Sequence, residues 1–152
     1  MKSITVYTDG SCYPNPGFGA WSAVVVDNDR EVLTLSGTQR IATNNQMELM
    51  GVIRILATLE EPCIVTLHSD SQYVVNAINS WMAKWQKSNW QRKQKGAGLV
   101  AVKNADLFQQ LMGLRKPHQL RAVWVRGHSG DKWNEYCDMV ASELVSDYYR
   151  NK

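Results

Sequence analysis

Four acidic residues occupy positions where an unpaired carboxylate would be costly. Asp9 and Asp70 each end a segment that predicts a β-strand, and Glu48 and Asp138 each continue the apolar face of a predicted helix. Burial of such a group without a partner is unfavourable. If the four meet at one edge of a sheet, they repel one another unless a cation joins them, and hard oxygen ligands suit Mg²⁺ or Mn²⁺ rather than zinc. Two such ions about 4 Å apart can activate a water and stabilise the leaving oxygen of a phosphodiester.

Each acid taken alone also has a purely structural interpretation. Aspartate at the end of a strand, as at Asp9 and Asp70, is common turn chemistry. Asn45-x-x-Glu48 fits a capping box, with Asn45 as the N-cap and Glu48 reaching back to it. Asp138 would be a surface residue if its helix were rotated. The conjunction of the four residues favours a metal site over these separate explanations.

One histidine lies where it could move protons near neutral pH. His128 stands in the glycine-flanked segment W-V-R-G-H-S-G, between the last predicted strand and the last predicted helix. A histidine in such a flexible loop can serve as a general acid or base. The alternative is an ordinary solvent-exposed loop histidine.

The basic charge of the chain is concentrated in one segment. The chain has 17 Lys+Arg and 14 Asp+Glu, yet no acidic residue occurs between Ser71 and Ala105. This segment also contains Trp81, Trp85 and Trp90. Basic residues interleaved with aromatic rings suit a nucleic acid, because cations neutralise phosphates and flat rings pack on sugars and bases. A solvated helix with its tryptophans turned to the core is the alternative. The segment's basic residues are Lys84, Lys87, Arg92, Lys93, Lys95 and Lys103.

The elements that must position these residues follow from periodicity and from turn residues. Strands are predicted at Ser3–Asp9, Ala20–Asp27, Val32–Gln39, Cys63–His68 and Leu120–Arg126. Helices are predicted from Asn44 or Asn45 to about Glu60, at Ser71–Ser80, at Trp81–Asn89, at Asn104–Gly113, and from about Trp133 to Tyr149, with a polar loop at Gln91–Gly98. The order predicts an α/β fold: a five-stranded mixed sheet, with three antiparallel strands and then two parallel additions, and helices on both faces.

Length and composition limit the protein class. With 152 residues, one domain spanning 1–152 is expected. A hydrophobic content of 44% and a charged content of 20% exclude a disordered or fibrous chain. No apolar run approaches the ~20 residues that span a bilayer, and no apolar signal core is evident, so we expect a cytoplasmic protein without a membrane partner. Three widely spaced cysteines argue against a disulfide framework.

Several motifs together resemble one known family. They are TDGSCYPNPG at Thr8–Gly17, TNNQMELM at Thr43–Met50, SDSQYV at Ser69–Val74, VKNADLF at Val102–Phe108, and VRGHSG with NEYCD within Val125–Asp138. In this set and order the chain resembles the catalytic domain of type 1 ribonuclease H, in its bacterial form, over nearly its whole length. The resemblance implies the ribonuclease H-like fold and an endonuclease that cuts the RNA strand of RNA–DNA hybrids. It also implies products with 3′-hydroxyl and 5′-phosphate ends and a monomeric protein.

The resemblance also implies roles for individual residues. Asp9, Glu48, Asp70 and Asp138 match the acidic quartet that holds two Mg²⁺ ions, for which Mn²⁺ can substitute; His128 matches a mobile catalytic histidine, and Glu135 a nearby auxiliary acid. Asn15, Asn44, Asn45 and Gln72 match positions that sense RNA 2′-hydroxyls, which distinguish RNA from DNA. Thr43 and Asn104 match a pocket for a phosphate of the DNA strand, and Trp81 matches a DNA-channel aromatic. The further substrate-binding positions are Cys12, Lys84, Trp85 and Lys87, and the basic segment at about 81–103 matches a protruding handle.

The chain departs from the family pattern in two places. The family often has Arg two residues before the threonine of its TNN motif, where this chain has Ile41, with Arg40 one position earlier. An offset of one residue turns a side chain to the other face of a strand, so Arg40 would need a local bulge to serve the phosphate pocket. The handle region Trp90–Asn104 is also a few residues longer than expected.

Two other functions would share part of this pattern. Another nuclease or strand transferase of the same fold, acting on DNA, would need the acids but not the ribose-sensing asparagines. A non-catalytic hybrid-binding module would keep the basic segment, but would not need an intact acidic set.

Overall fold

The alanine- and valine-rich strand β2 (Gly17–Asp27) lies inside a mixed sheet and is buried throughout Gly19–Val26. It pairs antiparallel with β1 (Lys2–Tyr13) on one side and with β3 (Arg30–Ala42) on the other. On the far side of β1, β4 (Cys63–Ser69) pairs in parallel, and β7 (Gln119–Trp124) is parallel to β4. The order β3-β2-β1-β4-β7 confirms the predicted five-stranded mixed sheet.

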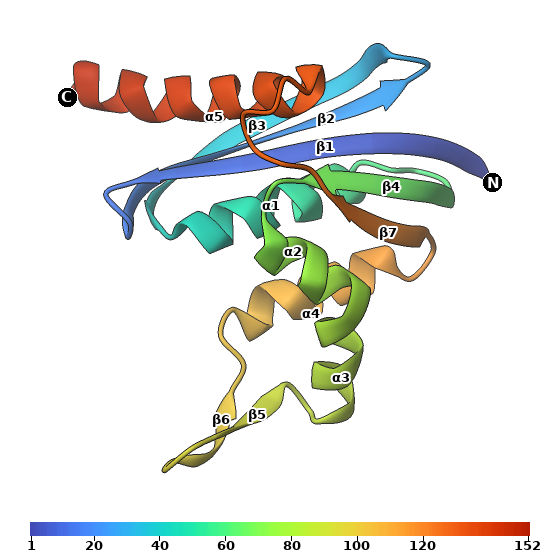
Figure 1. The fold of residues 1–152 in the computed structure, drawn as a ribbon, viewed down its shortest axis with the longest axis vertical. Helices are drawn as coiled ribbons and strands as arrows, with labels where there is room; N and C mark the ends of the chain where they lie inside the picture. The colour runs from blue at the N-terminus through green and yellow to red at the C-terminus, as the bar shows by residue number, and fades with distance from the viewer.

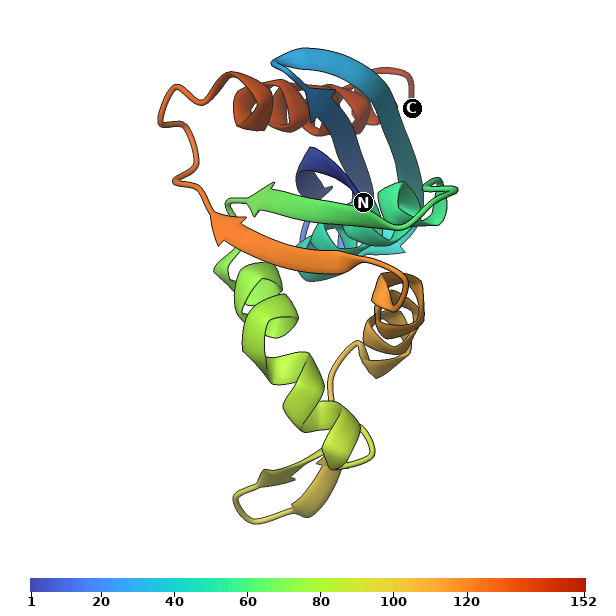
Figure 2. The same ribbon diagram turned by 90° about the vertical axis from the view of Figure 1, so that its right-hand side faces the viewer.

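Helices cover both faces of this sheet in the computed structural model, which describes residues 1–152 (Figure 1). The α5 helix (Lys132–Arg150) lies on one face, and α1 (Asn44–Ala57) and the remaining helices lie on the other, as Figure 2 shows from the side. The main core joins Leu49 and Leu56 of α1 to Val6 and Val65 of the sheet. Each such fully buried side chain stabilises the fold by roughly 1.5–3 kcal/mol. No helix of the structure is both long and apolar enough to span a membrane.

The basic segment forms a projection below the sheet in Figure 1. A continuous helical run, α2 (Gln72–Asn76), the π-helical turn η1 (Ala77–Trp81) and α3 (Met82–Lys87), replaces the two separate helices that were predicted. A hairpin of β5 (Gln91–Gln94) and β6 (Gly98–Ala101) replaces the predicted polar loop, and α4 (Ala105–Arg115) returns to the body. The hairpin gives no alternating apolar signal because its residues are almost all exposed.

Two element boundaries differ from the predictions, and β3 contains a bulge near the predicted phosphate pocket. β1 continues to Tyr13, because its pairing with β2 runs on as far as Tyr13↔Phe18, so Asp9 lies inside a strand rather than at its end. α1 ends at Ala57 instead of about Glu60. Between Gln39 and Ala42, β3 has one residue more than the facing part of β2, which is a β-bulge at Arg40 and Ile41.

Candidate active site

Two of the predicted acids meet where β4 stops and β1 continues. β1 and β4 pair in parallel up to Tyr7↔His68, and β4 ends at Ser69. Asp70 follows directly, beside the part of β1 that contains Asp9. The carboxyl edge of parallel strands is a common place for ligands in open sheets. Because Asp9 is 4% exposed and paired within the strand, opposite Ser22, the turn interpretation of this residue is wrong.

Glu48 joins these two acids from α1. One carboxylate oxygen from each of Asp9, Glu48 and Asp70 lies within 4.8 Å of the others, and we call these three residues the acidic cluster. The Gly10 N–H donates to Asp9 Oδ1 and to Glu48 Oε1. A Cβ at Gly10 would lie 2.7 Å from the Glu48 backbone nitrogen. Only glycine at position 10 therefore lets α1 approach β1 closely enough to place Glu48 in the cluster.

The cap of α1 excludes the structural interpretation of Glu48. Thr43, not Asn45, is the N-cap, and its hydroxyl accepts from the Gln46 N–H at 3.2 Å. The Thr43 N–H donates to Gln46 Oε1 at 3.1 Å, which completes a capping box. The capping box predicted for Asn45 and Glu48 is therefore wrong, because the pair that forms lies two residues earlier. Glu48 is left free to face the other acids.

Burial and mutual repulsion make the acidic cluster difficult to ionise. Burial, followed by the charges of Asp70 and Asp138, raises the pKa of Asp9 from 3.8 to about 7. Burial, followed by the charge of Asp9, raises the pKa of Glu48 well above its usual range. The pKa of Asp70 is also raised, first by burial and then by the charge of Asp138. Like charges at this distance inside a protein favour a protonated group or a bound cation.

The donors of the acidic cluster fit a divalent cation. Glu48 Oε2 is buried and has no hydrogen-bond partner. A buried acceptor without a partner is unusual in a folded protein. The cluster offers carboxylate oxygens and no sulfur or imidazole, which is the donor set of a hard cation.

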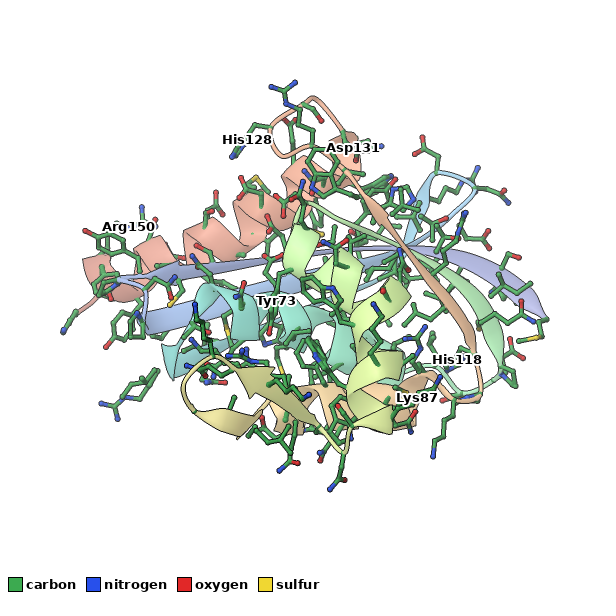
Figure 3. All side chains as sticks on the ribbon, turned by 60° about the horizontal axis from the view of Figure 1, so that its bottom comes forward. Tyr73, Lys87, His118, His128, Asp131 and Arg150 are labelled. Atoms are coloured by element: carbon green, nitrogen blue, oxygen red, sulfur yellow. The ribbon has the colours of Figure 1, made fainter.

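Asp138 and His128 flank the acidic cluster from the side of α5. Asp138 lies on the first half of that helix with its side chain 37% exposed, so it is less buried than predicted. His128 Nδ1 lies 3.9 Å from Asp138 Oδ2, and the His128 side chain is 81% exposed. His128 has φ 56°, in the left-handed region, and Figure 3 shows it in the loop before α5. Glu135, in the first turn of α5, is exposed.

Most of the predicted substrate-binding residues fall into two groups. The first group lines a hollow of about 400 Å³, which we call the polar hollow: Asn15, Thr43, Asn44, Asn45 and Asn104, together with Pro16 and Lys103, which were not predicted. Asn15 Oδ1 accepts from the Asn44 N–H at 3.2 Å, which ties the β1–β2 turn to the start of α1. Cys12 lies behind this turn, with its thiol directed at the carbonyls of Pro14, Gly17 and Ala42. Gln72 is exposed at the start of α2.

The second group lies along the projecting helices. Trp81 and Trp85 are half-buried, with ring centroids 5.7 Å apart, and Trp85 lies 5.0 Å from the ring of Phe108 in the core. Both tryptophans thus pack against the core and keep an exposed part. Lys84 and Lys87 are fully on the surface. The tryptophans therefore pack toward the core, as the alternative interpretation expects, while the exposed cations remain available for a nucleic acid.

Sequence reasoning missed three residues of this region. Lys103 supplies the cation of the polar hollow, whereas Arg40 does not line it despite the bulge. Gln46 and Tyr73 both bond to Asn104. The capping signal T-x-x-Q at Thr43–Gln46 could have identified Gln46. Tyr73 carries no such signal, because its contact is set by the packing of α2.

Comparisons with known proteins point to one family. The RNase H family model matches residues 1–146. The ribonuclease H of Xanthomonas axonopodis pv. citri is 48% identical over 141 residues, which cover 93% of this chain and 91% of that protein. The ribonuclease H of Caldicellulosiruptor saccharolyticus is 43% identical over 148 residues, which cover 97% of this chain and 99% of that protein.

Solved structures agree at the level of the fold. LC9-RNase H1, described as a type 1 RNase H with the type 2 active-site motif, superposes with a TM-score of 0.83 at 25% identity, over 97% of this chain and 74% of that one. LC11-RNase H1 in complex with an RNA/DNA hybrid superposes with a TM-score of 0.68 at 20% identity, over 92% of this chain and 94% of that one.

Proposed function

The chain belongs to the ribonuclease H family, and we propose that it hydrolyses the RNA strand of RNA–DNA hybrids by a two-metal-ion mechanism at the acidic cluster. The observation that carries this proposal is the convergence of one carboxylate oxygen each of Asp9, Glu48 and Asp70 within 4.8 Å. The helix α1, which contains Glu48, also lines the polar hollow through the asparagines at its start. All of these residues come from one chain, so a monomer is the proposed active unit.

Asp9, Glu48 and Asp70, with Asp138 at the rim, are the residues that would hold the metal ions. When bound there, Mg²⁺, or Mn²⁺ in its place, would supply activation of the attacking water and stabilisation of the leaving oxygen. The Gly10 N–H holds one oxygen each of Asp9 and Glu48, which orients both carboxylates before substrate arrives. The products would carry 3′-hydroxyl and 5′-phosphate ends.

His128 and Glu135 act at the rim of the site in this proposal. His128 lies on an exposed loop near Asp138, so it can reach the reacting phosphate without being fixed to it. Its imidazole accepts a proton from the attacking water or assists departure of the product. Glu135 is exposed one helical turn before Asp138 and contributes to product release.

Selection of the hybrid needs contacts to both strands. Asn15, Asn44, Asn45 and Gln72 present exposed amides, which can bond the 2′-hydroxyls of RNA and so separate a hybrid from duplex DNA. Thr43 and Asn104 in the polar hollow hold a phosphate of the DNA strand. A nuclease of the same fold that cuts DNA has no use for the ribose contacts.

The substrate class is tested with three labelled duplexes of one sequence: RNA–DNA hybrid, double-stranded RNA and double-stranded DNA, each with Mg²⁺. We expect cleavage of the RNA strand of the hybrid alone. Cleavage of DNA in either DNA-containing duplex would favour a DNA nuclease of the same fold, and binding without cleavage would favour a hybrid-binding module.

The exposed cations of the projection are expected to contribute to affinity rather than to chemistry. Replacement of Lys84, Lys87, Arg92, Lys93 and Lys95 by Ala should raise KM and leave kcat nearly unchanged. Each lost phosphate contact should lower the log–log salt slope of binding by about one. Steady-state kinetics at several salt concentrations measure both effects.

Lys2 and Arg30 provide the matched control. Lys2 is the first residue of β1 and Arg30 the first residue of β3, and both are exposed cations outside the projection. Their replacement by Ala should leave KM and the salt slope unchanged. An unaltered salt slope in the projection variant would show that these cations form only a solvated face.

A further inference from the structure

Gln46 does not line the polar hollow, but its side chain hydrogen-bonds to two residues that do, Thr43 and Asn104. Its Oε1 accepts from the Thr43 N–H at 3.1 Å, and its Nε2 donates to Asn104 Oδ1 at 3.4 Å. The first contact is an ordinary part of the capping box. The second joins the start of α1 to the residue before α4, 58 positions along the chain. The side chain of Gln46 therefore both caps α1 and holds Asn104, which lines the polar hollow.

Asn104 is held in an unusual way for a residue at a helix start. It is the N-cap of α4, yet its side chain makes no capping hydrogen bond, and its backbone is left-handed, with φ 61° and ψ 26°. An N-cap asparagine ordinarily uses its side-chain oxygen on the helix N–H groups. Here Oδ1 accepts from Gln46 instead, and Nδ2 donates to the Tyr73 hydroxyl at 3.2 Å. Tyr73 is the second residue of α2, and Figure 3 labels it near the middle of the view.

Gln46 and Tyr73 restrict the orientation of the Asn104 side-chain amide to different degrees. A tyrosine hydroxyl can donate or accept, so Tyr73 alone would tolerate the Asn104 amide in either orientation. The Gln46 NH₂ group can only donate, so it keeps the oxygen of Asn104 on its own side. One N–H of the Asn104 amide then bonds Tyr73, and the second N–H is left for a ligand.

The surroundings of this amide suit an anion. The Thr43 hydroxyl already accepts from the Gln46 backbone N–H, so its proton is free to donate elsewhere. Lys103 is the cation of the hollow, and the first turn of α1 contains no acid that would repel an anion bound near the positive end of the helix dipole. Ile41 and Arg40, which replace the family's arginine arrangement, do not line the hollow. Oriented donors therefore matter more in this chain than in one with an arginine there.

We propose that Gln46 is a positioning residue for the DNA strand: it fixes the orientation of the Asn104 amide, so that the hollow presents N–H donors to a backbone phosphate. This rests on the proposed function, because the phosphate belongs to the DNA strand of the hybrid. Gln46 touches neither substrate nor the acidic cluster in this account. Its loss therefore weakens binding and leaves the chemical step intact.

The test is a double-variant cycle with Gln46→Glu and Asn104→Ala. Glutamate keeps the acceptor for the Thr43 N–H, so the capping box and the melting temperature are retained, but it cannot donate to Asn104. The Kd of a fluorescein-labelled RNA–DNA hybrid is measured by anisotropy in the presence of a chelator, so that no cleavage occurs. We expect Gln46→Glu to raise Kd about five- to tenfold in the native background, in line with one misoriented hydrogen bond plus a nearby charge.

The same substitution in the Asn104→Ala background isolates the charge, and there we expect only about a twofold rise. The neutral variant Gln46→Ala should show the same non-additivity with Asn104→Ala. Gln119→Glu, at the exposed start of β7, is the control for added charge and should change Kd less than twofold. Equal Kd ratios in the two Asn104 backgrounds would overturn the positioning role.

Activity separates this inference from the proposed function. With Mg²⁺ at saturating hybrid, Gln46→Glu should retain kcat within about twofold of the unaltered protein, because the acidic cluster is not disturbed. A large fall in kcat with unchanged Kd would contradict the positioning role. Absence of hybrid cleavage by the unaltered protein would contradict the proposed function, while the chelator measurement would still decide the role of Gln46.

Discussion

Asp9→Asn is expected to abolish cleavage of the hybrid while making the metal-free protein more stable. Asp9 is 4% exposed, it lies within 4.8 Å of two other carboxylates, and burial and repulsion raise its pKa to about 7. A neutral amide of the same size removes the repulsion and also removes a metal ligand. The expected gain in unfolding free energy at pH 8 is on the order of 1–3 kcal/mol. Denaturant unfolding in a chelator measures it, alongside activity in Mg²⁺.

The pH dependence of this stability follows from the raised pKa. Between about pH 4 and pH 7 the folded protein holds a proton on Asp9 that the unfolded chain has released. Stability of the metal-free protein therefore falls as the pH rises through this window, and Asp9→Asn should flatten the fall. Asp147→Asn is the control: Asp147 is an exposed partner of Arg150 on α5, and its loss should change stability by less than about 0.5 kcal/mol. An Asp9→Asn protein that is active and destabilised would contradict the assignment.

His128→Ala is expected to lower kcat by about 100-fold and to change KM only a few-fold. General acid–base assistance is worth 10²–10⁴-fold, and the low end applies where bound cations carry most of the charge stabilisation. The His128 side chain is 81% exposed and its Nδ1 lies 3.9 Å from Asp138 Oδ2, so its removal leaves no cavity. The kcat and KM values across pH 6–9 measure the effect.

Ser129→Ala is the matched control in the same loop. The Ser129 hydroxyl donates to the Arg126 carbonyl, so this substitution alters the loop without removing the imidazole. It should retain kcat within a few-fold. If His128→Ala kept the full kcat across pH 6–9, His128 would have no role in catalysis.

The parts of the fold that follow an apolar pattern could be predicted from the sequence. The five-stranded sheet and the apolar face of α1 follow from alternation and helical spacing, because burial sets both patterns. The β5–β6 hairpin could not be predicted, because its strands are exposed and polar. The single helical run from Gln72 to Lys87 was also missed, since a π-helical turn leaves no distinct residue signal.

In the candidate site too, some residues could be predicted from the sequence pattern and others could not. Asp9, Glu48 and Asp70 could be found because a carboxylate stands out on an apolar element, and the structure brings these three together. Asp138 is more exposed than its apolar helix neighbours suggested, because it lies at the rim beside the His128 loop. Contacts such as that of Gln46 with Asn104 depend on how separate elements pack, which residue types and spacing do not specify.

The acidic cluster is proposed to be a metal-dependent centre for cleavage of the RNA strand. Single-turnover cleavage of a 5′-labelled RNA–DNA hybrid across a Mg²⁺ titration tests it most directly, with the unaltered protein and Asp70→Asn side by side. We expect no cleavage in a chelator, a saturable rise in rate with Mg²⁺ for the unaltered protein, and almost no cleavage by Asp70→Asn at any Mg²⁺ concentration. Cleavage by the unaltered protein in the chelator, or a normal rate for Asp70→Asn at high Mg²⁺, would contradict the proposal.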